Sequence, residues 1–93
     1  MKFSKYKLRK WSVRVRWRDR KCCVCGTRSK LEAHHIKCKS YHPKLAYTLS
    51  NGVTLCREHH TLLHIKFKGS FRMKTTDRDF NRFMDIVNNI KNV

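Results

Sequence analysis

The fold is decided between residues 22 and 64, which read CCVCGTRSKLEAHHIKCKSYHPKLAYTLSNGVTLCREHHTLLH and hold all five cysteines and all six histidines of the 93-residue chain. Two short pairs in this stretch have the spacing of metal-binding knuckles. They are Cys22-x2-Cys25, followed by Gly26 for the tight turn, and Cys56-x2-His59. Sulfur and imidazole nitrogen are the donors that tetrahedral Zn²⁺ prefers. The two pairs therefore predict a Cys3His structural zinc site.

The other two cysteines are not expected to bind this zinc. Cys23-x-Cys25 is shorter than the usual knuckle, and Cys38 has no partner at ligand spacing, so we expect a free thiol there, buried or half-exposed. An odd cysteine count with no signal peptide argues against a disulfide framework. A structural metal suits so short a chain, because one small core rarely contributes more than about 3–5 kcal/mol to folding stability without a disulfide or metal cross-link.

Five histidines remain once His59 is assigned to the zinc site. His42 lies in a polar loop and has no assigned role, which leaves His34, His35, His60 and His64 to explain. Neighbouring side chains of a strand point to opposite faces, so one ion would not ordinarily bind both His34 and His35. One of them can bind a second metal with His60, while the other stays metal-free and accepts a proton at neutral pH. The alternative is that the two histidines only end a strand of a zinc finger.

The pattern around these ligands predicts a strand, a loop, a second strand and a helix. Alternating residues indicate strands at 31–36 and 53–55, and the loop between them ends at the turn dipeptide Asn51-Gly52, which allows positive φ. Helical periodicity begins at residue 57, and a glycine at residue 69 is expected to end the helix.

A second helix is expected over residues 76–92 and is assigned mainly to closing the small core, with a dimer interface as the alternative. Thr76 is its candidate N-cap, with Asp79 three residues later. Its apolar residues recur at helical spacing: Phe80, Phe83, Met84, Val87 and Ile90.

Residues 1–21 form a basic segment whose periodicity is ambiguous. Trp11, Val13, Val15 and Trp17 alternate with polar residues as in a strand, whereas Leu8, Trp11 and Val15 fit a helical stripe. Periodicity alone slightly favours the strand.

The charge of the chain indicates a polyanionic partner. The chain has 23 Lys and Arg against 6 Asp and Glu, a formal net charge of +17. Positive charge spread along a whole domain points first to nucleic acid, and a ribosomal or other basic structural protein is the alternative. The sequence contains no transmembrane stretch and no broad apolar face beside its basic segments, so we expect a soluble, cytoplasmic protein without a membrane partner.

In this order, the residues resemble the HNH endonucleases of the ββα-metal, or His-Me finger, superfamily. The resemblance covers about residues 18–64, and an ordered set is much more specific than one knuckle. The matching residues are Arg18-Asp19, Cys22-x2-Cys25-Gly26, Leu31-Glu-Ala-His34-His35-Ile36, Asn51-Gly-Val-Thr-Leu-Cys56, His59-His60 and His64.

The resemblance implies a role for each matching residue. His35 would be the general base, His34 and His60 would bind a catalytic divalent ion, and Asn51 would brace the loop and orient the base. The ion would be Mg²⁺ or Mn²⁺, with Ni²⁺ or Zn²⁺ as alternatives. The structural zinc ligands would be Cys22, Cys25, Cys56 and His59. Apart from the resemblance, His64 lies one helical turn after His60 and Arg57 flanks the same helix, so both are candidate phosphate contacts, with simple packing as the alternative for His64.

Two positions depart from the family pattern, and neither affects the base or the catalytic ligands. Family members commonly have cysteine where His59 stands and often proline where Cys38 stands. The resemblance also implies a helix for the first segment, with Trp11 and Val15 packed on the zinc knuckle, and we adopt the helix.

The expected fold is α+β, a small ββα-metal core stapled by zinc with flanking N- and C-terminal helices. Residues 1–93 are expected to form one nuclease domain with its motif core at 18–66. We expect a DNA endonuclease or nickase, with a non-catalytic zinc-dependent nucleic-acid-binding module as the alternative. Double-stranded DNA is the expected partner, a further protein could supply specificity, and the chain could be a monomer or weak homodimer. A compact basic chain of this kind favours a phage or mobile element as its source.

Overall fold

A computed structural model describes residues 3–70 and 73–91 of the chain. It contains helix α1 (Lys5–Asp19), strand β1 (Leu31–His35), short 3₁₀ turns at Pro43–Leu45 and Leu49–Asn51, strand β2 (Gly52–Cys56), helix α2 (Arg57–Lys68) and helix α3 (Asp77–Lys91). The two strands form one antiparallel sheet in which Leu31 pairs with Cys56 and His35 with Gly52. The predicted α+β class and order of elements are therefore confirmed.

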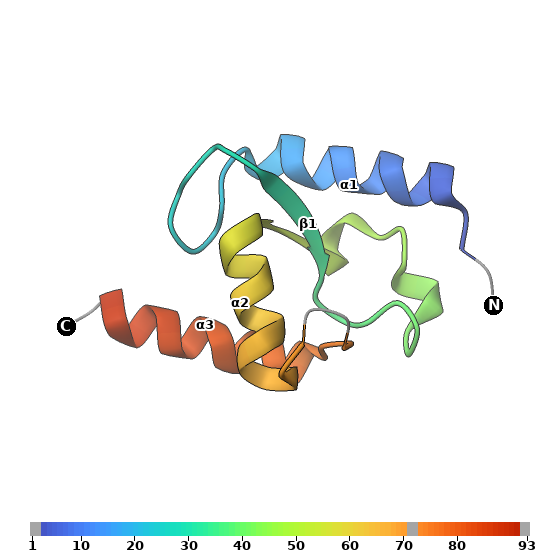
Figure 1. The fold of residues 1–93 in the computed structure, drawn as a ribbon. Helices are drawn as coiled ribbons and strands as arrows, with labels where there is room; N and C mark the ends of the chain where they lie inside the picture. The colour runs from blue at the N-terminus through green and yellow to red at the C-terminus, as the bar shows by residue number, and fades with distance from the viewer. Residues whose placement is uncertain (1–2, 71–72, 92–93) are drawn as a thin grey trace.

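The sheet lies between α1 and α2, as Figure 1 shows with α1 above the strands and α2 below them. The contacts of two neighbouring β1 residues agree with this arrangement: His34 contacts His60 of α2, while His35 stacks on Trp11 of α1. Helix α3 crosses and contacts α2 on the side away from α1 (Figure 1). Each histidine of the pair therefore belongs to a different layer.

The first segment is a helix, so the expectation from resemblance is confirmed and the strand alternative is wrong. Of the four alternating apolar side chains, only Trp11 and Val15 are buried, one helical turn apart, while Val13 and Trp17 are 37% and 66% exposed. Ser4 caps the helix by accepting a hydrogen bond from Lys7 N at 3.2 Å. The apparent alternation arose because both faces of α1 carry apolar residues.

Trp11 and Val15 do not pack as the sequence predicted. Their side chains face Gly52, at the end of β2 opposite Cys56 and its zinc knuckle. Gly52 has φ −117° and ψ 147°, which is extended backbone and no positive-φ turn. A Cβ there would lie 2.5 Å from Val15 Cγ2, so this position needs glycine for close approach of α1.

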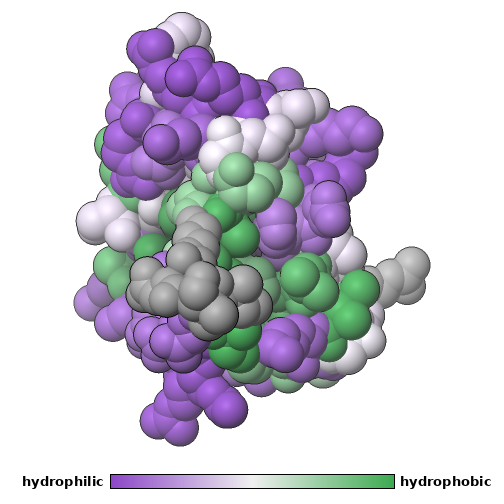
Figure 2. All heavy atoms as spheres, turned by 90° about the vertical axis from the view of Figure 1, so that its left-hand side faces the viewer, coloured by the Kyte–Doolittle hydropathy of each residue, from purple (hydrophilic) through white to green (hydrophobic). Residues whose placement is uncertain are grey.

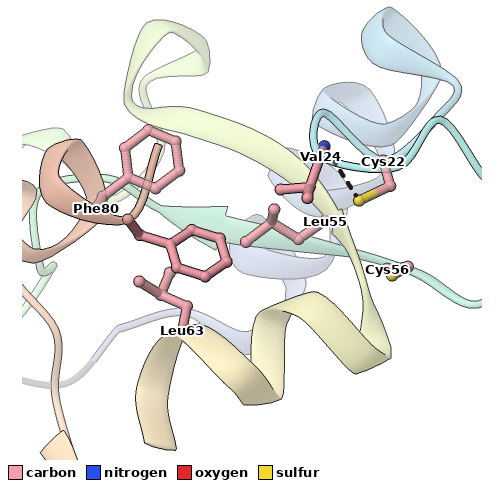
Figure 3. Close-up of a cluster of buried hydrophobic side chains, with 7 residues drawn as sticks. Cys22, Val24, Leu55, Cys56, Leu63 and Phe80 are labelled. Carbon is pink, nitrogen blue, oxygen red and sulfur yellow. Dashed lines mark hydrogen bonds between the residues drawn. The ribbon is translucent and has the colours of Figure 1, made fainter. Parts of the chain in front are cut away.

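The main core lies on the other side of the sheet, between β2, the first knuckle, α2 and α3. Figure 3 shows Val24, Leu55, Leu63 and Phe80 converging there. Phe83 is only 2% exposed, so α3 closes this core as its amphipathic pattern predicted.

Both predicted helix boundaries near the core are confirmed. Gly69 ends α2 at φ 74°, and Thr76 forms the predicted reciprocal cap with Asp79, with distances of 3.0 and 3.3 Å between each backbone nitrogen and the partner side-chain oxygen. The Ile90 side chain and residue 92, which the prediction included, lie outside what is described. None of the helices in the described ranges has the length and apolar character needed to cross a bilayer.

Candidate functional site

Four donors from the two predicted knuckles converge at the far end of β2. The ligand atoms of Cys22, Cys25, Cys56 and His59 all lie within 4.8 Å of one another. Cys25 Sγ is 3.9 Å from Cys56 Sγ, and Cys22 Sγ is 3.9 Å from His59 Nδ1. Zn–S bonds of about 2.3 Å place tetrahedral sulfur ligands about 3.8 Å apart. The cluster therefore fits the predicted Cys3His zinc site.

The turn that carries the first two ligands is held by backbone hydrogen bonds. Gly26 has φ 75° and its N–H donates to Cys22 O at 2.9 Å, as a tight knuckle requires. Burial opposes ionisation of Cys22, but hydrogen bonds from the backbone of Cys25, Cys56 and Val24 lower its pKa and favour the thiolate that binds metal. Cys23 is half-buried and is not part of the cluster.

A second cluster joins His34 of β1 to His60 and His64 of α2. Their ligand atoms also lie within 4.8 Å of one another, and His34 Nδ1 is 3.2 Å from His60 Nε2. Two imidazole nitrogens that share a tetrahedral ion at about 2.0–2.1 Å are about 3.3–3.4 Å apart. His34 and His60 therefore meet as predicted, and the structure adds His64 as a third donor.

Hydrogen bonds behind this cluster set which nitrogens face it. His60 Nδ1 lies 3.0 Å from Glu32 Oε1, and His64 Nδ1 lies 2.8 Å from Met73 O. An ionised carboxylate oxygen and a carbonyl oxygen can only accept a hydrogen bond. The ring hydrogen of His60 and of His64 therefore sits on Nδ1, and the lone pair of Nε2 faces the cluster. Lone pairs that converge in this way are the arrangement that a cation requires.

Burial keeps the imidazoles of His34 and His60 neutral. It is the main cause that lowers the pKa of His34 well below its usual value, with His60 and His64 adding repulsion. Burial also lowers the pKa of His60, although Glu32 opposes this shift. Neutral imidazole is the form that binds a metal ion. His34 Nε2 is buried and has no hydrogen-bond partner in the described residues.

His35 faces the other layer and is held on two sides. Its ring stacks on Trp11, with 3.8 Å between centroids and 10° between planes, and its Nε2 lies 2.9 Å from Ala46 O. Because a carbonyl only accepts, Nε2 carries the hydrogen and the lone pair is on Nδ1. Burial lowers the pKa of His35 despite the hydrogen bond to Ala46, so the ring is neutral and can accept a proton.

Asn51 connects the two ends of the loop between the strands. Its Oδ1 accepts from Lys37 N at 2.8 Å, and its Nδ2 donates to Lys37 O at 3.0 Å and Leu45 O at 3.2 Å. Leu45 precedes Ala46, whose carbonyl holds His35. Asn51 therefore braces the loop, and its backbone oxygen also accepts a hydrogen bond at 2.9 Å from Ile36 N, next to the predicted base His35.

One cleft of about 300 Å³ brings both histidines of the pair together. His34, His35, His60 and His64 line it, with Lys39 and Lys74 among the lining residues. His35 reaches the cleft because it is the last residue of β1. Cys38, the expected free thiol, is half-buried and also lines the cleft.

Sequence reasoning missed the part played by Glu32 and the role of His64 as a third donor. Glu32 lies two residues before His34, so strand alternation puts both on one face, and this signal could have identified the carboxylate. Glu32 Oε2 also accepts from Arg57 Nε at 3.3 Å, so Arg57 supports the carboxylate while its side chain stays 67% exposed. The sequence placed His64 in the same cleft as His60, as a candidate phosphate contact. The structure confirms its place in the cleft and adds that its ligand atom groups with those of His34 and His60.

The Arg18-Asp19 dipeptide ties α1 to the start of β2. Arg18 donates to Leu49 O at 2.9 Å and to Gly52 O at 2.8 Å, while Asp19 Oδ2 accepts from Thr54 N at 3.1 Å. Hydrogen bonding by Arg18 is the main cause that lowers the pKa of Asp19. These contacts keep α1, and with it Trp11, against the sheet beside His35.

The comparison with protein families agrees with this geometry. Residues 22–66 match the family described as HNH endonuclease. The matched stretch contains both clusters, so the resemblance inferred from the sequence is confirmed there. Neither the curated proteins nor the solved structures contain a match to this chain. A match to this family points to nuclease activity in general, and so to a nucleic-acid substrate.

Proposed function

We propose that this protein is a metal-dependent HNH endonuclease or nickase that hydrolyses phosphodiester bonds of DNA. The observation that carries the proposal is the single cleft in which three convergent imidazoles lie beside a fourth, His35, that is neutral and held by groups of its own. The match of residues 22–66 to HNH endonucleases supports the same chemistry.

In this proposal the chain's own residues position and deprotonate a water molecule. His35 accepts the proton at Nδ1, because Nε2 is engaged with Ala46 O and the ring is fixed against Trp11. Asn51 keeps the loop that carries Ala46 in place. A positioned base of this kind contributes typically 10²–10⁴-fold to a rate.

The metal ligands of the proposal are His34, His60 and His64. Their donor set and the support of His60 by Glu32 fit a divalent ion, which when bound supplies Lewis-acid stabilisation of charge on the scissile phosphate. Mg²⁺ and Mn²⁺ are the ions expected from the resemblance, whereas the three nitrogen ligands suit Ni²⁺ or Zn²⁺ better. His64 is thereby reassigned from a phosphate contact to a metal ligand.

Positive charge around the cleft suits a phosphate backbone. Lys39 and Lys74 line the cleft, and Arg57 remains largely exposed at the start of α2. Figure 2 views the molecule from the left-hand side of Figure 1 and is coloured by hydropathy; hydrophilic residues cover much of that face, around a hydrophobic area in its middle and lower part. A net charge of +17 would attract DNA before any base is contacted.

Cleavage of supercoiled plasmid tests the proposal. Zinc-loaded protein with Mg²⁺ or Mn²⁺ should nick or linearise the plasmid, and His35→Ala should lose about 10²–10⁴-fold of this activity while still binding DNA. His42→Ala is the matched control, because His42 is an exposed loop residue outside both clusters. Binding without cleavage by the wild-type protein, across Mg²⁺, Mn²⁺, Ni²⁺ and Zn²⁺, would instead support a non-catalytic binding module.

A further inference from the structure

The outer side of α1 carries large side chains that the core does not use. Tyr6, Val13 and Trp17 are 74%, 37% and 66% exposed, whereas Trp11 and Val15 on the inner side are buried. At 3.6 residues per turn, the three exposed residues fall in a stripe about 40° wide. We call Tyr6, Val13 and Trp17 the outer stripe. Tryptophan is usually well buried, so the exposure of Trp17 in the outer stripe indicates a binding surface.

Arginine side chains surround the tryptophan of the outer stripe. A hollow of about 430 Å³ is lined by Val13, Arg16, Trp17 and Arg20. The Arg20 guanidinium carbon lies 5.1 Å from the centroid of the Trp17 ring, within the range of a cation–π contact. Arg20 Nε also donates to Trp17 O at 3.2 Å, which keeps the guanidinium beside the ring.

The charge of α1 is almost uncompensated. Residues 1–21 contain ten Lys and Arg and a single acidic residue, Asp19. That carboxylate is already engaged by Arg18 at 2.8 Å and by Thr54 N at 3.1 Å. An aromatic row within such a field complements a nucleic acid strand, because the cations attract its phosphates and the rings offer a face for its bases.

We propose that the outer stripe of α1 binds an unpaired DNA strand, with a base stacked on Trp17 and flanking phosphates at Arg16 and Arg20. The bases of a duplex are already stacked and paired, so an exposed ring gains most from a strand whose bases are accessible. This proposal rests on the proposed nuclease function only in taking DNA as the nucleic acid that is bound. The hollow at Trp17 shares no lining residue with the cleft at His34 and His35.

The outer stripe and the cleft together indicate which class of DNA the protein binds best. The cleft is lined by residues of β1 and α2, whereas the outer stripe is the exposed side of α1. Figure 1 shows α1 and α2 on opposite sides of the strands. DNA that carries a single-stranded segment next to a duplex, such as a flap or a gap, could engage both surfaces. We therefore expect such DNA to bind more tightly than a continuous duplex of the same length.

Binding of short oligonucleotides tests the proposal without cleavage. Zinc-loaded protein with no other divalent ion is titrated with single-stranded and duplex DNA of equal length, and the titration is repeated in His35→Ala. Base stacking changes affinity by about 5- to 150-fold on alanine substitution, so Trp17→Ala should weaken single-strand binding by that factor and duplex binding by less than about twofold. Trp17→Phe keeps a ring and should retain most of the affinity.

Tryptophan fluorescence provides a second readout. The chain has two tryptophans and Trp11 is only 4% exposed, so quenching by a stacked base would report Trp17. Leu62→Ala is the matched control, because it shortens an exposed apolar side chain on α2 without changing charge. Because no step needs cleavage, failure of this test leaves the nuclease proposal standing, and failure of the plasmid assay leaves this one standing.

Three results would overturn the proposal. Trp17→Ala could bind single-stranded DNA as tightly as Leu62→Ala, which would exclude stacking. Equal losses for the single strand and the duplex would show that the stripe does not select unpaired bases. A dimer that dissociates on Trp17→Ala substitution, seen by light scattering, would assign the stripe to a second copy of this chain.

Discussion

Replacing Gly52 with alanine sets two opposite physical effects against each other. The backbone there is extended, at φ −117° and ψ 147°, which alanine adopts without strain. Reduced freedom of the unfolded chain would alone stabilise the variant by about 0.4–1 kcal/mol. The added Cβ, however, would lie 2.5 Å from Val15 Cγ2 and 2.7 Å from Trp11 Cζ2, in a packed layer. The sign of the change therefore shows which effect dominates.

The steric effect should dominate. Carbon atoms in contact are ordinarily about 3.5–4.0 Å apart, so both neighbours must move, and Trp11 and Val15 are both buried. Overpacking typically costs about 1–3 kcal/mol, and we expect a net loss of about 1–2 kcal/mol in the free energy of unfolding. Gly52 pairs with His35, which stacks on Trp11, so plasmid cleavage should fall as well.

Urea unfolding of the zinc-loaded protein measures this change. In a Val15→Ala background the same substitution should cost less, because the nearer contact is gone, and the two effects should couple by at least about 0.5 kcal/mol. Gly69→Ala is the control for backbone strain without a steric clash, because φ is +74° and nothing lies within 4 Å of the added Cβ. A Gly52→Ala variant as stable as the wild type, or more stable, would refute the close-approach argument.

Three further predictions concern the metals and the charge. Removing zinc with a strong chelator should unfold the middle of the chain, because binding in small zinc peptides is worth roughly 10–16 kcal/mol; native near-UV circular dichroism in a verified zinc-free sample would contradict the site. Glu32→Gln should weaken Mn²⁺ or Ni²⁺ binding at the histidine cluster by about 10–100-fold in calorimetric titrations, whereas exposed Glu58→Gln should not. DNA affinity should fall steeply with salt, and a flat plot of log affinity against log salt concentration would rule out binding dominated by phosphates.

Local features of the molecule could be predicted because neighbouring residues control them. The Cys22-x2-Cys25 turn depends on Gly26, and the start of α3 depends on Thr76 and Asp79, three residues apart. The separation of His34 from His35 follows from the period of two in a strand. These features needed no knowledge of how distant segments meet.

The first helix shows where periodicity failed. Trp11 and Val15 face the sheet, while Val13 and Trp17 face solvent. Apolar residues on both faces imitate strand alternation, and contacts with distant residues such as Gly52 and His35 distinguish the inner pair from the outer one. A helix with apolar residues all round its axis carries little information about its own orientation.

The sequence by itself determined the four donors of the zinc site, the positive charge and the order of strand and helix, because these depend on residue type and short spacing. Tertiary structure decided that the Cys22 knuckle meets Cys56, that His64 joins His34 and His60, and that Glu32 supports the histidine cluster. It also decided why Gly52 is glycine, since the requirement comes from α1 packing across the strand. Strand register and helix packing bring these residues together across long separations in the chain, which no local pattern specifies.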